Sequence, residues 1–167
     1  MKKIFIIILS LLFITGCGKE MDTPTSKVES FINDYQNLSD NVIDNLEKSI
    51  KKEDLTDKQK KRYQAIMEKQ YQNLSYKITN EEIINDTAIV NVEIEVLNYG
   101  YSLANSKKYY EDHKEEIKNY NDYKLEELEK VTDKIKYNIV FTLTDFNGVW
   151  ELNELDKNDI KKIHGLY

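Results

Sequence analysis

The chain has little cysteine, proline, glycine and histidine. Its 167 residues include one cysteine, one proline, five glycines and two histidines. A single cysteine excludes an intramolecular disulfide, so the hydrophobic core alone must stabilise the fold. The isolated glycines form no glycine-rich phosphate-binding loop, and the two histidines lack the spacing of a zinc-binding helix.

Positive charge is also scarce. Lysine and arginine number 24 against 30 acidic residues, giving a net charge of −6, or −8 without residues 1–16. This balance argues against nucleic acid as a partner and against a basic patch on anionic lipid. Asp145 to Gly148 mimics the start of a calcium loop but lacks the remaining ligands. We therefore expect no metal ion and no other cofactor.

The one long hydrophobic run lies at the start of the chain. Lys2 and Lys3 precede an almost unbroken apolar segment, residues 4–14, which is followed by Gly16 and the only cysteine, Cys17. A basic start, an apolar run and small residues before a cleavage point are typical of a secretory signal. The run is shorter than the roughly 20 residues of a membrane-spanning helix. An ordinary secretory signal would leave Cys17 as a free thiol in an oxidising compartment.

The segment Ile14 to Cys17 resembles a bacterial lipobox, in which the signal is cut before the cysteine and the sulfur carries a diacylglycerol. The resemblance implies a lipoprotein signal peptide over residues 1–16, lipidation of Cys17, and a short tether over residues 17–24. Two acyl chains anchor a protein stably. We therefore expect attachment to the cell membrane on its extracytoplasmic face, without a membrane-spanning helix.

Helical patterns follow the tether. Pro24 suits a first helical turn, and Ser26 to Glu29 has capping-box spacing. An apolar stripe then continues to Leu46, with a kink or break expected at residues 39–41. A second helix is predicted from Thr56, with a capping box to Gln59. A third is predicted over residues 102–131, with an interruption at 119–122 and a buried stripe of Tyr109, His113, Ile117, Tyr120, Leu128 and Val131.

Two segments have the two-residue period of antiparallel strands. Residues 88–96 alternate in polarity and pair with a strand containing Tyr76 and Ile78, through a turn near Asn85. A bulge at residues 80–82 is predicted, because a regular register would turn Ile78 away from the core. Residues 135–143 form the second hairpin, where Asn147-Gly148 predicts a type I′ turn that places Leu143 opposite Leu152 and Asp145 opposite Trp150.

These elements predict an α+β fold. The expected order is helix, helix, hairpin, helix, hairpin and a short terminal helical turn, in a single domain over residues 25–167. A curved antiparallel sheet of about four strands should pack on helices on one face.

Two stretches carry a family resemblance, Gln70 to Ile78 and Lys162 to Tyr167. They resemble a family of small uncharacterised lipoproteins of low-GC Gram-positive bacteria, and the similarity extends through Tyr123 to Leu125 and the Trp150 strand. The resemblance implies a nuclear-transport-factor-two-like, or cystatin-like, cone in which a curved sheet wraps around long helices. That fold hosts enzymes, ligand pockets and interaction modules alike, and no catalytic residue is carried over with it.

No catalytic constellation is present in the sequence. His113 reads as a surface or half-buried residue, and His164 as part of a fixed turn beside Gly165, which permits positive φ. Tyrosine is abundant, with twelve in the chain. Tyrosines at helical spacing are usually part of a core edge, but they are also enriched at binding surfaces. If the cone holds a cavity, its rim is predicted at Tyr99, Tyr101, Tyr109 and Trp150.

Three functions are compatible with this sequence. The leading hypothesis is a non-enzymatic, lipid-anchored extracytoplasmic binding or protein-interaction domain, whose partner is an envelope protein or a small ligand. The first alternative is a small-molecule carrier or sensor that holds its ligand in the cone. The second is a hydrolase or isomerase with an acid–base pair inside the cavity.

Overall fold

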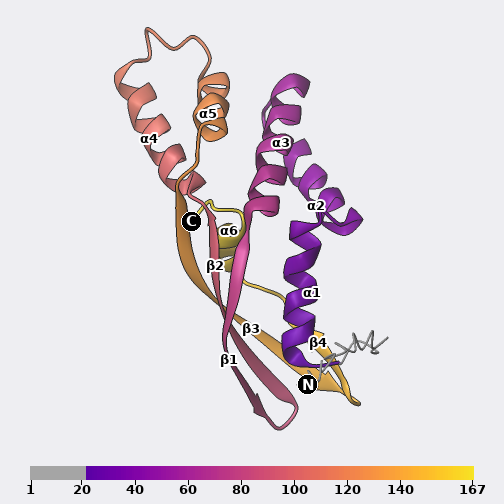
Figure 1. Cartoon of the computed structure of the whole chain (residues 1–167). Helices are drawn as coiled ribbons and strands as arrows, with labels where there is room; N and C mark the ends of the chain where they lie inside the picture. The colour runs from indigo at the N-terminus through magenta and orange to yellow at the C-terminus, as the bar shows by residue number, and fades with distance from the viewer. Residues whose placement is uncertain (1–21) are drawn as a thin grey trace, which may run out of the picture.

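The computed structural model describes residues 22–167; the predicted signal peptide and Cys17 lie outside the described residues. Six helices and four strands follow one another within this part of the chain. The strands form one open antiparallel sheet in the order β1-β2-β3-β4. This confirms the predicted α+β class and the curved sheet of about four strands that packs on helices (Figure 1).

The first hairpin comprises β1 (Ser75–Ile84) and β2 (Thr87–Leu97). The turn at residues 85–86 is as predicted. Tyr76 pairs with Ile94 and Ile78 with Val92, and both side chains pack against the core, the face predicted for them. The register shifts between Ile78 and Asn80, one residue before the predicted bulge. The bulge therefore exists at Thr79, where it keeps Ile78 opposite a buried valine.

The second hairpin joins β3 (Lys134–Phe146) to the short β4 (Val149–Leu152). Asn147 has a φ of 58° and Gly148 a φ of 86°, the positive values that a type I′ turn requires. Leu143 pairs with Leu152 and Asp145 with Trp150, as predicted.

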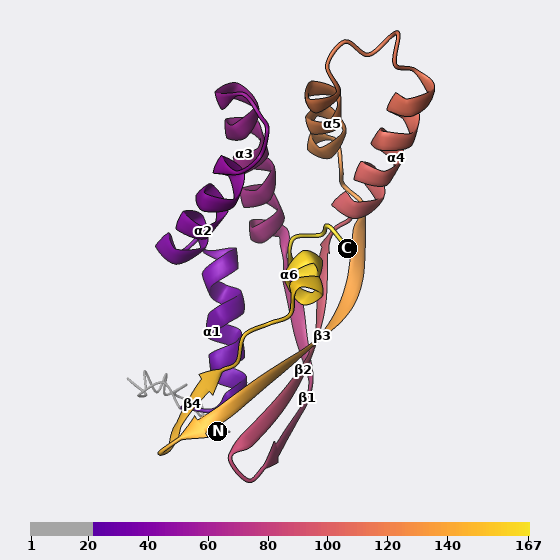
Figure 2. The same ribbon diagram turned by 180° about the vertical axis from the view of Figure 1, so that it is seen from behind.

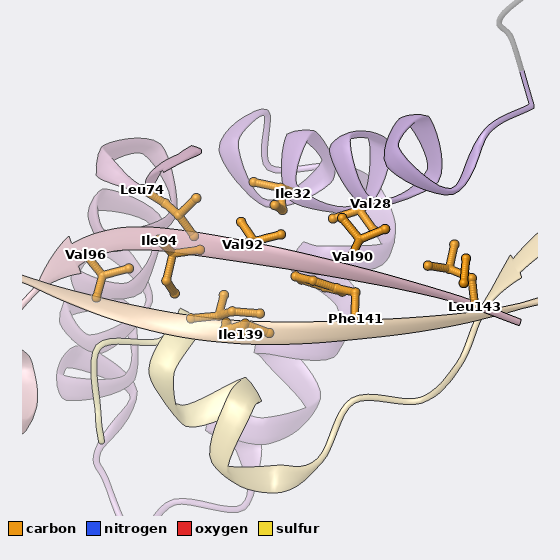
Figure 3. Packing of buried hydrophobic residues seen from close by; sticks show 12 residues of the cluster. Val28, Ile32, Leu74, Val90, Val92, Ile94, Val96, Ile139, Phe141 and Leu143 are labelled. Carbon is orange, nitrogen blue, oxygen red and sulfur yellow. The ribbon is translucent and has the colours of Figure 1, made fainter. Parts of the chain in front are cut away.

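One face of the sheet carries the main hydrophobic core. Alternate residues of β2, from Ala88 to Val96, are at most 1% exposed, and so are Ile139, Phe141 and Leu143 of β3. Figure 3 shows how these side chains meet Val28 and Ile32 of α1 (Pro24–Gln36). Ile163 of α6 (Lys157–Ile163) completes the same cluster. The chain's own side chains thus fill this face of the sheet.

Three helices precede the sheet. The capping box of α1 uses Thr23 and Ser26, so the box predicted at residues 26–29 was wrong by three positions. The predicted break occurs at residues 37–39, where Leu38 adopts a φ of 53°, and separates α1 from α2 (Asp40–Lys51). The capping box at Thr56 is confirmed and starts α3 (Asp57–Asn73).

The helical segment predicted over residues 102–131 has its interruption earlier than the expected position at 119–122. The segment forms α4 (Tyr99–Asp112) and α5 (Tyr120–Glu129), and residues 113–119 between them are not α-helical. Of the predicted stripe only Leu128 is buried, because the helices turn other side chains toward α3. The core there contains Ile66, Leu97, Tyr99, Leu125 and Leu128. Figure 2 shows α4 and α5 extending beyond the ends of β2 and β3.

A buried glutamine fastens the C-terminal segment to the sheet. The side chain of Gln70 is fully buried; its oxygen accepts from the Leu97 N–H at 2.9 Å. Its amide nitrogen donates to the carbonyls of Leu97 and Ile163, both at 3.4 Å. Gly165 has a φ of 67°, and a Cβ there would collide with the Leu97 carbonyl and the Gln70 amide. The chain end is therefore held at one position against β2 and α3.

Candidate ligand-binding cleft

Four helices surround a partly enclosed cleft of about 300 Å³. Phe31 and Tyr35 of α1 form one wall, Leu46 of α2 another, and Tyr71 of α3 closes the far side. His164, the residue that ends α6, completes the lining. The cleft therefore joins segments from both ends of the described chain.

Aromatic rings form the apolar part of this cleft. The Tyr35 ring lies 5.0 Å from the Tyr71 ring at an interplanar angle of 83°, and 5.3 Å from the Phe31 ring. Edge-to-face contacts of this kind are favourable because a positive ring edge meets a negative ring face. Tyr71 is 2% exposed, whereas Phe31 and Tyr35 are only half-buried and present ring surface to the cleft.

His164 provides a polar group in the aromatic wall. Its Nε2 lies 3.2 Å from the Tyr71 hydroxyl, and its ring centroid lies 5.5 Å from the Tyr71 ring. Burial lowers the pKa of His164 to about 4, because the imidazolium would lose its hydration there. Its Nδ1 has no hydrogen-bond partner among the described residues, which leaves a polar ring nitrogen available.

The electrostatics of the pair favour hydrogen bonding over proton transfer. Burial, with smaller effects from Tyr35 and Tyr63, raises the pKa of Tyr71 above its ordinary value. At neutral pH both His164 and Tyr71 are therefore uncharged. A general base works best with a pKa near the operating pH, and both pKa values are displaced away from neutrality. The arrangement is suited to orienting a ligand.

Polar side chains lie at the mouth of the cleft. Asp34 of α1 and Asn41, Asn45 and Ser49 of α2 are exposed and line it. The Asp34 carboxylate forms no ion pair or hydrogen bond with any described residue. No lysine or arginine lies among the described residues that line this space. The cleft thus combines apolar depth with a single negative charge at its mouth.

The four residues predicted for a cone rim lie apart. Tyr99 is fully buried between α3 and α5, and its hydroxyl donates to the Ile66 carbonyl at 3.0 Å. Burial raises its pKa to about 12. Tyr101 and Tyr109 on α4 are 66% and 46% exposed and line two separate shallow hollows. Trp150 lies on β4, at the other end of the sheet (Figure 1).

Sequence reasoning missed the cleft itself. Tyr35 lies in the first predicted helical segment, Tyr71 in the helix predicted from Thr56, and His164 in the predicted terminal turn. Nothing in the sequence links the three. The turn is present, since Gly165 has positive φ, but it also places the imidazole beside Tyr71. The one available signal was a histidine next to a glycine in an otherwise apolar terminal segment. Asp34 and Asn45 carried no signal of their own.

Metal ligands, membrane-spanning helices and similarity to known proteins also bear on the class of site. Within residues 22–167, no three His, Cys, Asp or Glu side chains are grouped to hold a metal ion. None of the helices in that range has both the length and the apolar character needed to cross a bilayer. Comparisons with protein-family models, with curated proteins and with solved structures gave no significant match. The geometry of the cleft is therefore the basis for assigning a function.

Proposed function

We propose that this protein is a non-enzymatic, lipid-anchored binding protein of the extracytoplasmic membrane face, and that it takes its ligand in the cleft between α1, α2, α3 and α6. The observation that carries the proposal is the convergence of the half-buried Phe31 and Tyr35 rings and the His164 side chain in one partly enclosed space. Ligand sites in proteins are concave, largely apolar and supplied with a few polar groups.

The packing of the sheet supports this location over a cone cavity. The core-facing residues of β2 and β3 are buried against α1 and α6, so a ligand would have to displace them. Such close-packed side chains are costly to separate. The cleft between the helices needs no such rearrangement.

A site-specific photo-crosslinker tests ligand binding in cells. A photoreactive amino acid in place of Asn45, which is exposed at the mouth of the cleft, should give a specific adduct. The matched control replaces Asn138, an exposed asparagine on β3 outside the cleft. Equal labelling at both positions, or none at Asn45, would count against the proposal.

The membrane anchor is tested separately through Cys17. Cys17→Ser should release the protein from the membrane fraction or leave its precursor uncut, because the acylated sulfur is lost. A processed chain that remains attached to membranes would contradict the anchor.

A further inference from the structure

The walls of the cleft match one chemical class of ligand. Methylated ammonium groups have apolar methyl surfaces and a positive charge, and they carry no N–H that needs an acceptor. Aromatic faces attract such cations through the ring quadrupole, most strongly where water is excluded. Phe31 and Tyr35 supply partly exposed ring surface, with the buried Tyr71 ring packed behind Tyr35. Asp34 supplies the only charge among the described lining residues.

From this match, and resting on the proposed function above, we infer that the cleft binds a small, free organic cation that bears a methylated ammonium group. The cavity volume of about 300 Å³ lies at the lower end of the range of small-molecule sites, so it accommodates a head group and little more.

The charges around the cleft also exclude closely related ligands. A zwitterionic phospholipid head group carries a phosphate, and no lysine or arginine among the described lining residues would receive it. An anionic ligand would face Asp34 without compensation. A primary ammonium would need several acceptors close together. Asp34, Asn41, Asn45 and Ser49 offer them only at the exposed mouth, whereas the inner wall consists mostly of rings and aliphatic groups.

The experiment compares choline with its neutral isostere, in which a carbon atom replaces the nitrogen. The full-length protein in neutral detergent micelles is titrated with each compound, with the amide and aromatic resonances recorded by NMR. Choline should bind and shift resonances of Tyr35 and Tyr71, and the isostere should bind at least about fivefold more weakly. Equal binding of both, or no choline binding, would overturn the cation assignment.

Variants separate the contribution of the Asp34 carboxylate from that of the Tyr35 ring. Asp34→Asn should weaken choline binding about fivefold, whereas Asp44→Asn makes the same charge change on α2 outside the cleft and should leave it unchanged. Tyr35→Leu should weaken it about tenfold, and Tyr35→Phe, which keeps the ring, should retain it. Identical affinities for Asp34→Asn and Asp44→Asn would overturn the role of the carboxylate.

Two further outcomes complete the test. Phosphocholine should bind more weakly than choline, and tighter binding of phosphocholine would overturn the assignment to a free cation. If choline fails while the crosslinker at Asn45 still captures a ligand, the methylated-ammonium class is wrong and the binding function stands.

Discussion

The titration of His164 should make folding stability depend on pH in a defined window. An imidazole with an ordinary pKa of 6.5 in the unfolded chain has a pKa of about 4 in the folded protein. Protons therefore bind the unfolded state more readily between these values, so stability is fully present above about pH 6.5 and falls as the pH falls toward 4.

The size of the effect follows from the two pKa values. Each unit between them corresponds to about 1.4 kcal/mol. At pH 5 protonation of His164 lowers the free energy of unfolding by about 2 kcal/mol, and the loss approaches about 3 kcal/mol near pH 4. Against a typical unfolding free energy of about 5–15 kcal/mol this is a large fraction.

Urea unfolding at a series of pH values between 7.5 and 4 (~0.5 apart) would measure this loss by linear extrapolation. His164→Gln keeps a hydrogen-bonding side chain but cannot titrate, so its stability should decline less steeply than that of the parent chain between pH 6.5 and 4. His113→Gln, which replaces the other histidine, stacked on Tyr109 outside the cleft, is the matched control substitution. Parallel curves for the parent chain and His164→Gln would refute the reasoning.

The C-terminal attachment gives two further predictions. Gly165→Ala should cost more than about 2 kcal/mol of unfolding free energy, since it combines positive φ with a steric collision, whereas Gly148→Ala, which has positive φ in open space, should cost about 1 kcal/mol. Gln70→Leu should lower the free energy of unfolding by about 2–4 kcal/mol, because the buried Leu97 N–H loses its acceptor. Gln64→Leu on the same helix, whose amide bonds only Glu68 across one turn, should lower it by less than about 0.5 kcal/mol. Urea unfolding measures both pairs, and equal losses within either pair would contradict the stated role of that residue.

The hairpins could be predicted because their determinants are local. The alternation in β2 fixes which face is buried, and Asn147-Gly148 fixes the register of β3 with β4. The bulge could be predicted because a two-residue turn without one would point Ile78 away from the core. The structure places the bulge at Thr79 and not at residues 80–82.

The buried faces of α4 and α5 were harder to predict, because tertiary contacts decide which face of each helix points inward. Tyrosines on α4 and α5 recur at helical spacing, so periodicity alone favoured them as a buried stripe. In the structure Leu125, together with Leu128 of the predicted stripe, packs in one cluster with Ile66, and Tyr109 stacks on His113 at 4.0 Å instead. Packing against α3 outweighed the local pattern.

The cleft could not be predicted because its parts are distant in sequence. Tyr71 and His164 are 93 residues apart, and Asp34 belongs to a helix at the other end of the described chain. Each residue taken alone has an ordinary structural role. The packing of α1 on α3 and the docking of α6 on the sheet bring them together.

The attachment of α6 has a consequence for biosynthesis. Because His164 supplies a wall of the cleft and Gln70 holds the neighbouring carbonyl, a nascent polypeptide has no complete site until residue 164 has emerged. Contacts between α1 and such a late segment also require closure of a very long loop, which slows folding. Nascent or truncated chains ending before His164 would therefore present an open aromatic surface to chaperones and proteases, and the cleft would be complete only when the fold is.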